Sequence, residues 1–194
     1  KTAAQKKQLL GVILQDVQRL DRLITDISQA SRVDHEIMGQ DFILVDFARL
    51  VNNFVQMRSQ TYSSHELRFV MPESPVMLRV NESRMVQVLD NILSNAISFS
   101  PERCTVKFIM RRQVTNNTIV LDIVDEGPGI PETKLETVFD RFYSERPSGE
   151  RFGQHSGLGL SIARQIINAH NGRLTARNLP EGGARFRLAL PLES

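Results

Sequence analysis

The stretch that decides the fold is Asp125-Glu126-Gly127-Pro128-Gly129-Ile130, which ends an apolar strand in a sharp turn. Ile119, Leu121 and Ile123 precede it with the period of two that is typical of a strand. Two glycines around a proline permit a tight turn without bulky side chains. This leaves room for a flat ligand beside Asp125, whose ionised carboxylate can only accept hydrogen bonds and therefore suits the amine of adenine. By itself the hexapeptide is equally compatible with an ordinary polar turn.

The composition is that of a globular protein, because 41% of the 194 residues are hydrophobic and 24% are charged. The net charge of +2 is too balanced to predict a nucleic-acid partner. The single cysteine, Cys104, excludes an internal disulfide, and we expect a reducing compartment. No apolar run reaches the roughly 20 residues of a membrane span, so we expect no membrane contact from these residues. Because the first residue is Lys1, we expect a fragment of a longer protein.

Residues 1–38 are predicted to form one long helix. Its apolar residues recur at alternating steps of three and four, the heptad pattern of a helix that packs against another helix. These residues are Leu10, Ile13, Val17, Leu20, Ile24 and Ile27. We expect the helix to belong to a helical hairpin or a dimer bundle and to end at Gly39; a lone surface helix is the alternative. Residues 39–194 then form a second domain.

Alternating strand and helix patterns after Gly39 predict an α/β domain with helices over a mixed sheet. We expect strands at 42–45, 67–71, 76–80, 104–110, from 118, 173–177 and 185–190, and helices after Asp46, from Asn81 to Pro101, near 132–139 and after Gly157. The strand at 42–45 is expected to be buried. Met57 is expected on the apolar face of the helix that Asp46 caps.

Asn91 and Asn95 are four residues apart on the expected helix from Asn81 and therefore share one face. Their neighbours are apolar, so the two carboxamides need partners. A hydrated Mg²⁺ that holds phosphates would supply one. The spacing by itself fits two exposed asparagines better.

Gly157-Leu158-Gly159-Leu160 opens a predicted helix with glycines, which let backbone N–H groups approach a phosphate at the positive end of the helix dipole. The spacing matches neither a P-loop nor a Rossmann fingerprint. Residues 140–156 before it carry several arginines and glycines and form a long connection. We interpret this connection as a lid over a polyphosphate, with a disordered surface loop as the alternative.

Five short motifs follow one another in an order that resembles the N, G1, F, G2 and terminal boxes of sensor histidine kinases. They are Asn91-Ile-Leu-Ser-Asn95, Asp125-Glu-Gly-Pro-Gly129-Ile, Phe139-Asp-Arg-Phe142, Gly157-Leu-Gly-Leu160 and Gly183-Ala-Arg-Phe186. The resemblance runs from Phe42 to the end of the chain and is specific because of the order, since each motif alone is weak. Residues 9–36 resemble the second helix of the dimerisation and phosphoacceptor hairpin. Their sequence is similar to that of the acid- and host-responsive sensor kinases of alphaproteobacteria.

The resemblance implies an α/β two-layer sandwich of the Bergerat type, with a mixed sheet, helices on one face and a long N-terminal helix. It also implies ATP and Mg²⁺ as cofactors, with Asp125 receiving the adenine amine and Phe99 lying against the base. The implied catalytic residues are Asn91, Asn95 and Arg141: Asn95 would ligate Mg²⁺, Asn91 would help to hold ion and phosphates, and Arg141 would approach the terminal phosphate. The other implied cofactor-binding residues are Gly127, Gly129, Ile130, Phe142, Ser156, Gly157, Leu158, Gly159 and Leu160.

Four positions depart from the family pattern. Ser98 stands where these kinases usually carry lysine or arginine, so one phosphate contact is missing or comes from the lid. His155 and Ser156 replace the usual glycine and threonine before the G2 box, and Arg185 stands at a common threonine position. We therefore expect a modest nucleotide affinity.

The phosphorylated histidine of the family is followed by glutamate, with proline five residues on. His35-Glu36 imitates the start of that motif, but Gln40 occupies the proline position and His35 falls at the end of the second helix, so we reject it. We interpret His65 and His170 as structural, with His170 near a helix end where a cation suits the dipole. The chain is therefore expected to bind ATP·Mg²⁺ without phosphorylating itself.

The implied function is transfer of the ATP γ-phosphoryl group to a histidine upstream, for relay to a cognate response regulator. The resemblance further implies a homodimer through the N-terminal helix and a place in the cytoplasmic, C-terminal part of an inner-membrane receptor. One alternative is a clamp-type ATPase of the gyrase, Hsp90 and MutL class, which uses a glutamate where this chain has Asn91. The others are a serine kinase of the anti-sigma type and a degenerate, non-catalytic kinase module.

Overall fold

The computed structural model describes residues 42–143 and 157–192, together with Ile13 and Val17. Apart from these two residues, the predicted heptad helix lies outside the described part of the chain, as do Ser156 and the lid beyond Tyr143. Within the described ranges, no helix combines the length and the apolar character needed to cross a membrane.

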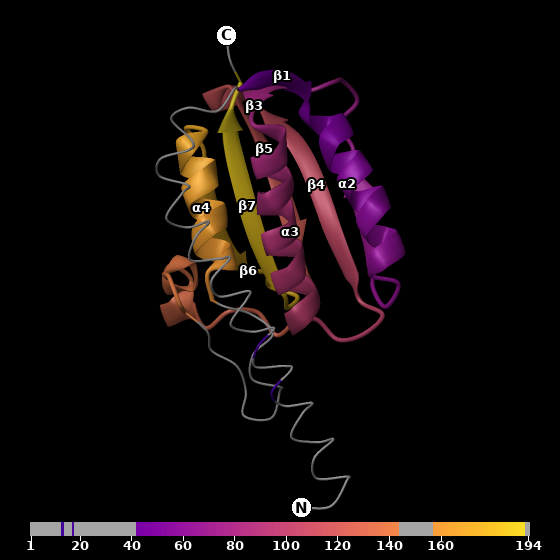
Figure 1. Ribbon diagram of the computed structural model, residues 1–194, viewed down its shortest axis with the longest axis vertical. Helices are drawn as coiled ribbons and strands as arrows, with labels where there is room; N and C mark the ends of the chain where they lie inside the picture. The colour runs from indigo at the N-terminus through magenta and orange to yellow at the C-terminus, as the bar shows by residue number, and fades with distance from the viewer. Residues whose placement is uncertain (1–12, 14–16, 18–41, 144–156, 193–194) are drawn as a thin grey trace, which may run out of the picture.

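Five strands form a mixed sheet with the order β2-β4-β5-β7-β6 (Figure 1). Only β2 and β4 run parallel, and the other neighbours are antiparallel. The strands are β2 Glu66–Val70, β4 Thr105–Gln113, β5 Thr118–Val124, β6 Arg173–Asn178 and β7 Ala184–Pro191. The predicted mixed sheet is therefore confirmed, with β5 at its centre.

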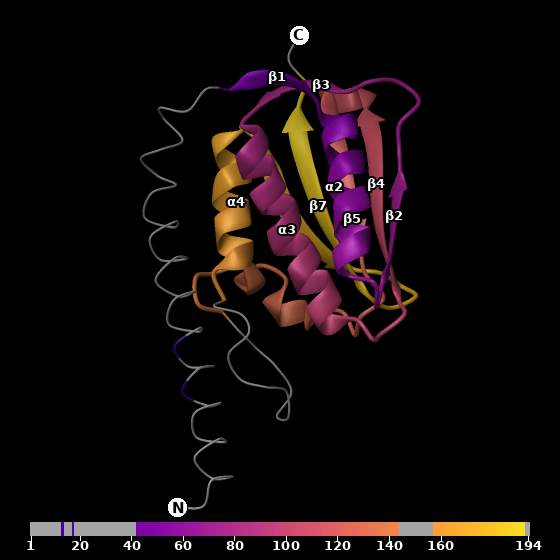
Figure 2. The same cartoon turned by 45° about the vertical axis from the view of Figure 1, so that its right-hand side comes forward.

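Three helices cover one face of this sheet, as Figures 1 and 2 show from two directions. They are α2 Phe47–Thr61, α3 Glu82–Phe99 and α4 Gly159–Ala169. Asp46 caps α2 by accepting from the backbone N–H groups of Ala48 and Arg49, and Asn81 caps α3 by accepting from Arg84. Both caps satisfy donors that a helix start leaves without intrahelical partners, which is why the two helix starts were predictable.

The core lies between the helices and the sheet. Alternate residues of each strand face it, as the fully buried Phe108 of β4, Leu121 of β5 and Phe186 of β7 illustrate. From α3, Leu89 and Ile92 pack into the same cluster. The two-layer α/β sandwich predicted from the sequence is thus the observed fold.

The strand predicted at 42–45 is not buried. It corresponds to β1 (Ile43–Asp46), where Ile43 is 49% and Leu44 is 59% exposed. The reason is that β1 pairs only with β3 (Met77–Val80), in an antiparallel two-stranded sheet separate from the main one. Two strands alone have no second layer to cover both faces.

Two further expectations are corrected. Met57 is 67% exposed, and it is Arg58 that lies over the Phe54 ring, 5.6 Å from its centroid, where it pairs with Asp90. The helix expected near 132–139 is two separate 3₁₀ turns, Glu132–Lys134 and Thr137–Phe139. Such short connections commonly adopt this tighter geometry.

His170 is structural, as predicted, but it is not a cation. It ends α4, is 6% exposed, and its Nδ1 donates to the Ile166 carbonyl at 2.8 Å. Its Nε2 accepts from the Asn81 N–H at 3.1 Å, which requires the neutral ring. Burial lowers the pKa of His170, and the hydrogen bond to Ile166 opposes this only in part. The imidazole therefore joins the end of α4 to the start of α3 in neutral form.

Candidate functional site

Asp125 follows β5 and is only 5% exposed. Its Oδ1 accepts two backbone hydrogen bonds, from Gly127 at 2.9 Å and from Ala184 at 3.0 Å. No described residue donates to Oδ2. The carboxylate is therefore held at one oxygen by the backbone, while the other oxygen is left as an acceptor for a ligand.

Burial raises the pKa of Asp125 above its ordinary value, and the N–H groups of Ala184 and Gly127 act in the opposite direction. A donor placed at Oδ2 would stabilise the ionised form further. The physical consequence is that a ligand with an N–H in this place would bind the carboxylate in a site with little water, where such a bond is strong.

The glycine turn is shaped by contacts that admit no side chain. A Cβ on Gly127 would lie 3.0 Å from Asp125 Oδ1 and 3.0 Å from the backbone oxygen of Phe99. Gly129 has a φ of +81°, and a Cβ there would lie 2.8 Å from Asn178 Oδ1. The end of α3, the turn and the end of β6 therefore meet at the site.

Asn178 was missed by the sequence analysis although it fixes the turn. Its Oδ1 accepts from the Ile130 N–H at 2.8 Å, and its Nδ2 donates to the Ile130 carbonyl at 2.6 Å and to Glu132 at 3.1 Å. Gly183 was quoted only as part of a motif, yet a Cβ on it would collide with the backbone oxygen of Asp125. Both contacts join segments distant in sequence, and a single chain gives no local signal for them.

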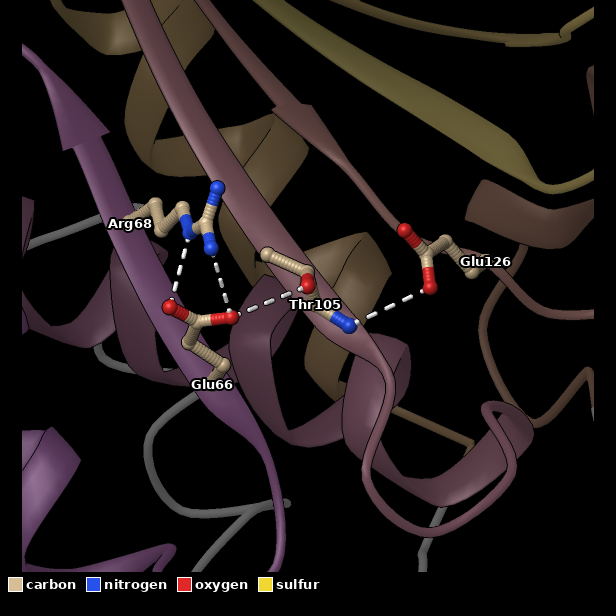
Figure 3. Close-up of polar contacts among 4 residues, drawn as sticks. All are labelled: Glu66, Arg68, Thr105 and Glu126. Carbon is tan, nitrogen blue, oxygen red and sulfur yellow. Dashed lines mark hydrogen bonds and ion pairs between the residues drawn. The ribbon is translucent and has the colours of Figure 1, made fainter.

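The outer side of the turn is tied to the sheet by a second polar cluster, drawn in Figure 3. The Glu126 carboxylate accepts from the Thr105 N–H at 3.3 Å. Glu66 accepts from Arg68 at 2.8 and 3.0 Å and from the Thr105 hydroxyl at 3.4 Å. The hydrogen bond from Arg68 lowers the pKa of Glu66. These contacts connect the residue after Asp125 to the first residues of β4 and β2.

Asn91 lies on α3 opposite the start of α4. A Cβ on Gly159 would lie 3.5 Å from both Cγ and Oδ1 of Asn91, so the two motifs are neighbours. The Asn91 Nδ2 is buried and has no hydrogen-bond partner among residues 42–143 and 157–192. In either orientation of the amide, a buried polar group is left to be satisfied. Asn95 lies one turn further along α3 and is half-buried.

The F and G2 motifs meet at the base of the predicted lid. The Phe142 N–H donates to the Gly157 carbonyl at 3.0 Å. Gly157 has a φ of +71°, and a Cβ there would lie 2.8 Å from the Tyr143 oxygen. Phe142 is 61% exposed and Arg141 is also exposed, whereas Leu158 is buried in the core. The structure thus brings the two ends of the intervening segment together.

The helix α3 joins the start of α4 to the glycine turn. Asn91, which lies beside Gly159 of α4, and Phe99, which lies beside Gly127 of the turn, are eight residues apart, or about 12 Å of helix. Asn95 lies midway and on the same side, since residues four apart share a face. The described residues contain no cluster of three or more His, Cys, Asp or Glu side chains that could hold a metal ion. A cation here would need amide oxygens, water and ligand oxygens.

The sequence and the fold both have relatives among known proteins. Residues 80–194 match the family model described as histidine kinase-, DNA gyrase B- and HSP90-like ATPase. The sensor protein ChvG of Rhizobium meliloti is 41% identical over 199 residues, which cover 96% of this chain and 34% of that protein. The chain therefore spans about a third of the length of the curated relatives that it matches.

Two solved structures share the fold. The mycobacterial sensor histidine kinase MprB is 26% identical, with a TM-score of 0.66 over 77% of this chain and 97% of that chain. The histidine kinase ThkA, solved in complex with the response regulator protein TrrA, gives a TM-score of 0.76 at 21% identity, over 100% of this chain and 53% of that one. The second likeness concerns the fold alone.

Proposed function

The chain belongs to the histidine kinase-, DNA gyrase B- and HSP90-like ATPase family, on the branch of the sensor histidine kinases, and we propose that it binds ATP with Mg²⁺ for phosphoryl transfer to a histidine. That histidine would lie upstream in the full-length kinase. The likeness to a Rhizobium relative agrees with the alphaproteobacterial subfamily predicted from the sequence.

The observation that carries the proposal is the line of contacts along α3. Asn91 faces Gly159 at one end, and the Phe99 backbone faces Gly127 at the other. A nucleotide placed along this line would have its base at the glycine turn and its phosphates at the start of α4. The positive end of a helix dipole favours phosphate there.

At the base end, Asp125 Oδ2 would accept from the exocyclic amine of adenine. Guanine carries a carbonyl at the same position, and two acceptors facing each other repel. The glycines supply the space for the flat ring, and Ile130, pinned by Asn178, is among the partly buried residues packed on the core. The proposed site therefore selects ATP over GTP.

At the phosphate end, the buried amide of Asn91 has no partner among the described residues and would be satisfied by a phosphate oxygen or by the cation. Asn91 and Asn95 would hold Mg²⁺ through amide oxygens, together with water and phosphates. The ion would neutralise charge on the phosphates during transfer. Arg141 and the backbone of Gly157 to Leu160 are proposed to contact the phosphate chain, and Ser156 lies outside the described residues.

A clamp-type ATPase is the competing function within this family. It needs a general base to activate water, and Asn91 is an amide that cannot take up a proton in this role. An asparagine at position 91 instead favours transfer of the phosphoryl group to a side chain of the full-length kinase, because that acceptor would supply its own nucleophile.

The proposed partners follow from the same assignment. A cognate response regulator would receive the phosphoryl group, by analogy with ThkA, which was solved in complex with the response regulator protein TrrA. Homodimerisation is proposed through the N-terminal heptad helix, where Ile13 and Val17 are 50% and 55% exposed. We place the domain on the cytoplasmic side of an inner-membrane receptor, with no membrane or nucleic-acid contact of its own.

The test is calorimetric titration of the chain with ATP in Mg²⁺ and again in excess EDTA. Saturable binding that needs Mg²⁺, hydrolysis that stays slow and no acid-labile label on the chain are expected. Asn91→Ala should lose the Mg²⁺-dependent part of the affinity, while Asn53→Ala, an exposed change on α2, should keep it. Rapid steady hydrolysis would favour the clamp ATPase, and absence of Mg²⁺-dependent binding would favour a non-catalytic module.

A further inference from the structure

The five-stranded sheet has a second face, opposite the one that the helices cover (Figure 2). Successive strand residues point to opposite faces, so Phe108 of β4 enters the core while Lys107 and Ile109 face away from it. The strand register places the residues of this second face in three rows that cross the sheet.

The first row, nearest Asp125, contains Arg177, Arg185, Val124, Lys107 and Arg68; the second contains Thr175, Arg187, Asp122, Ile109 and Val70; the third contains Arg173, Ala189, Val120 and Arg111. These rows hold seven cations and one carboxylate, and Glu66 and Glu126, which both contact Thr105 beside Arg68, add two more carboxylates. The resulting net charge of about +4 contrasts with +2 for the whole chain. We call this surface the basic sheet face.

Some of its charges are neutralised within the face. Asp122 is buried and accepts from Arg187 at 2.6 and 2.8 Å and from Arg111. Arg68 pairs with Glu66 (Figure 3). The remaining cations, which make no ion pair with any described residue, are Lys107, Arg173, Arg177 and Arg185.

The first row also places like charges directly opposite each other. Arg177 faces Arg185 across β6 and β7, and Arg68 faces Lys107 across β2 and β4. Such pairs weaken a sheet. In addition, the Nε of Arg185 is buried and has no hydrogen-bond partner in the part of the chain that the structure describes. Glu66 offsets part of this cost at Arg68, whereas no described carboxylate pairs with Arg177 or Arg185, and such violations are expected where a surface serves a function.

The shape of the basic sheet face and its residue types exclude several classes of ligand. A sheet face without walls does not enclose a small molecule. The three rows contain no aromatic side chain, so they offer no platform on which single-stranded bases could stack. The strongly exposed apolar residue of these rows is Val70, which lies at the sheet edge. The face therefore offers little apolar surface for insertion into a lipid layer. The planar guanidinium group of arginine can donate two parallel hydrogen bonds to a carboxylate, so the face suits an acidic ligand.

We propose that the basic sheet face docks an acidic helix of a partner protein, which lies across the strands along the first row. Adjacent strands are about 4.8 Å apart, and carboxylates four residues apart on a helix are about 5–6 Å apart. One side of an acidic helix can therefore pair with the cations of the row. This inference does not depend on nucleotide binding, because the face lies on the other side of the sheet from α3.

The test measures fluorescence anisotropy of a labelled 20-residue alanine-rich helix that carries glutamate at every fourth position. The 194-residue chain is titrated into it without nucleotide, at low salt, and a lysine version of the helix serves as the probe control. Saturable binding of the glutamate helix alone is expected. Vesicles of phosphatidylglycerol and a single-stranded oligonucleotide are tested in parallel, and tighter binding to either would overturn the proposal.

The first variant is Lys107→Gln combined with Arg177→Gln, which removes two unpaired cations of the row. An exposed ion pair contributes a factor of about two to five, so the double variant should bind about fourfold to 25-fold more weakly. Arg49→Gln with Arg112→Gln changes the net charge equally at exposed sites off the face and should leave the affinity within about twofold. Equal weakening by both pairs would refute a defined docking face, and Arg177→Gln alone repeats the test should the double variant unfold.

Discussion

The neutral, buried His170 makes the stability of the domain depend on pH in a defined direction. Its ring donates to Ile166 and accepts from Asn81, and it also packs on Phe42 with ring centroids 4.7 Å apart. Burial lowers the pKa of His170 from its ordinary value of 6.5. In the unfolded chain the ring takes up a proton near that ordinary value, whereas in the folded domain it does so only at lower pH.

The sign and size follow from proton linkage. Between the lowered pKa of the folded state and the ordinary pKa of 6.5, the unfolded state binds up to one more proton than the folded state, so stability falls as the pH drops and is recovered as the pH rises. The maximum slope for one proton is about 1.4 kcal/mol per pH unit. Between pH 7.0 and 5.5 we therefore expect His170 to account for a loss of up to about 1 kcal/mol in the free energy of unfolding.

The assay is urea unfolding followed by circular dichroism at several pH values, since the chain contains no tryptophan. His170→Gln removes the titrating ring, and the difference in pH slope between wild type and variant isolates its contribution. Loss of the Asn81 contact is expected to lower the stability of the variant by about 1–3 kcal/mol at all pH values, so the slope is the informative quantity. His65→Gln serves as a control for loss of a histidine elsewhere. A His170→Gln variant that keeps the wild-type slope would refute the reasoning.

Three further substitutions test the packing around the site by urea unfolding. Gly183→Ala should cost at least about 1 kcal/mol more than Gly182→Ala, because both have positive φ but only the former meets the Asp125 backbone; equal costs would contradict the contact. Asn178→Ala should cost about 1–3 kcal/mol, because it leaves the Ile130 backbone groups without their partner; a neutral effect would count against that role. Phe108→Ala should cost about 3–5 kcal/mol, since the ring is fully buried; a cost below about 1 kcal/mol would place it outside the core.

Local signals in the sequence were sufficient for most of the elements, although the helix expected near 132–139 is two 3₁₀ turns. Asp46 and Asn81 mark helix starts because a cap acts within a few residues. The alternation before Asp125 gave β5 because side-chain direction along a strand depends only on position. The order of the motifs, rather than any one of them, was sufficient for the two-layer fold.

The features that could not be predicted from the sequence depend on residues far away in the chain. The exposure of β1 depends on which strand it joins, and that is decided by Met77–Val80 more than 30 residues away. The neutral state of His170 depends on the N–H of Asn81, and the shape of the glycine turn depends on Asn178. The row of like charges on the basic sheet face became visible only once the register of five strands was known.

The most direct test of the nucleotide site compares ATP and GTP binding by the wild-type chain and by Asp125→Asn, using calorimetry in Mg²⁺. The amide can no longer accept at both oxygens, so the variant loses either the backbone bonds or the bond to adenine. We predict a loss of about 1.5–3 kcal/mol in ATP binding free energy, or roughly tenfold to 150-fold in affinity, with ATP preferred over GTP by the wild type and full ATP affinity kept by Glu73→Gln. An Asp125→Asn chain that remains folded and binds ATP as tightly as the wild type would contradict the account.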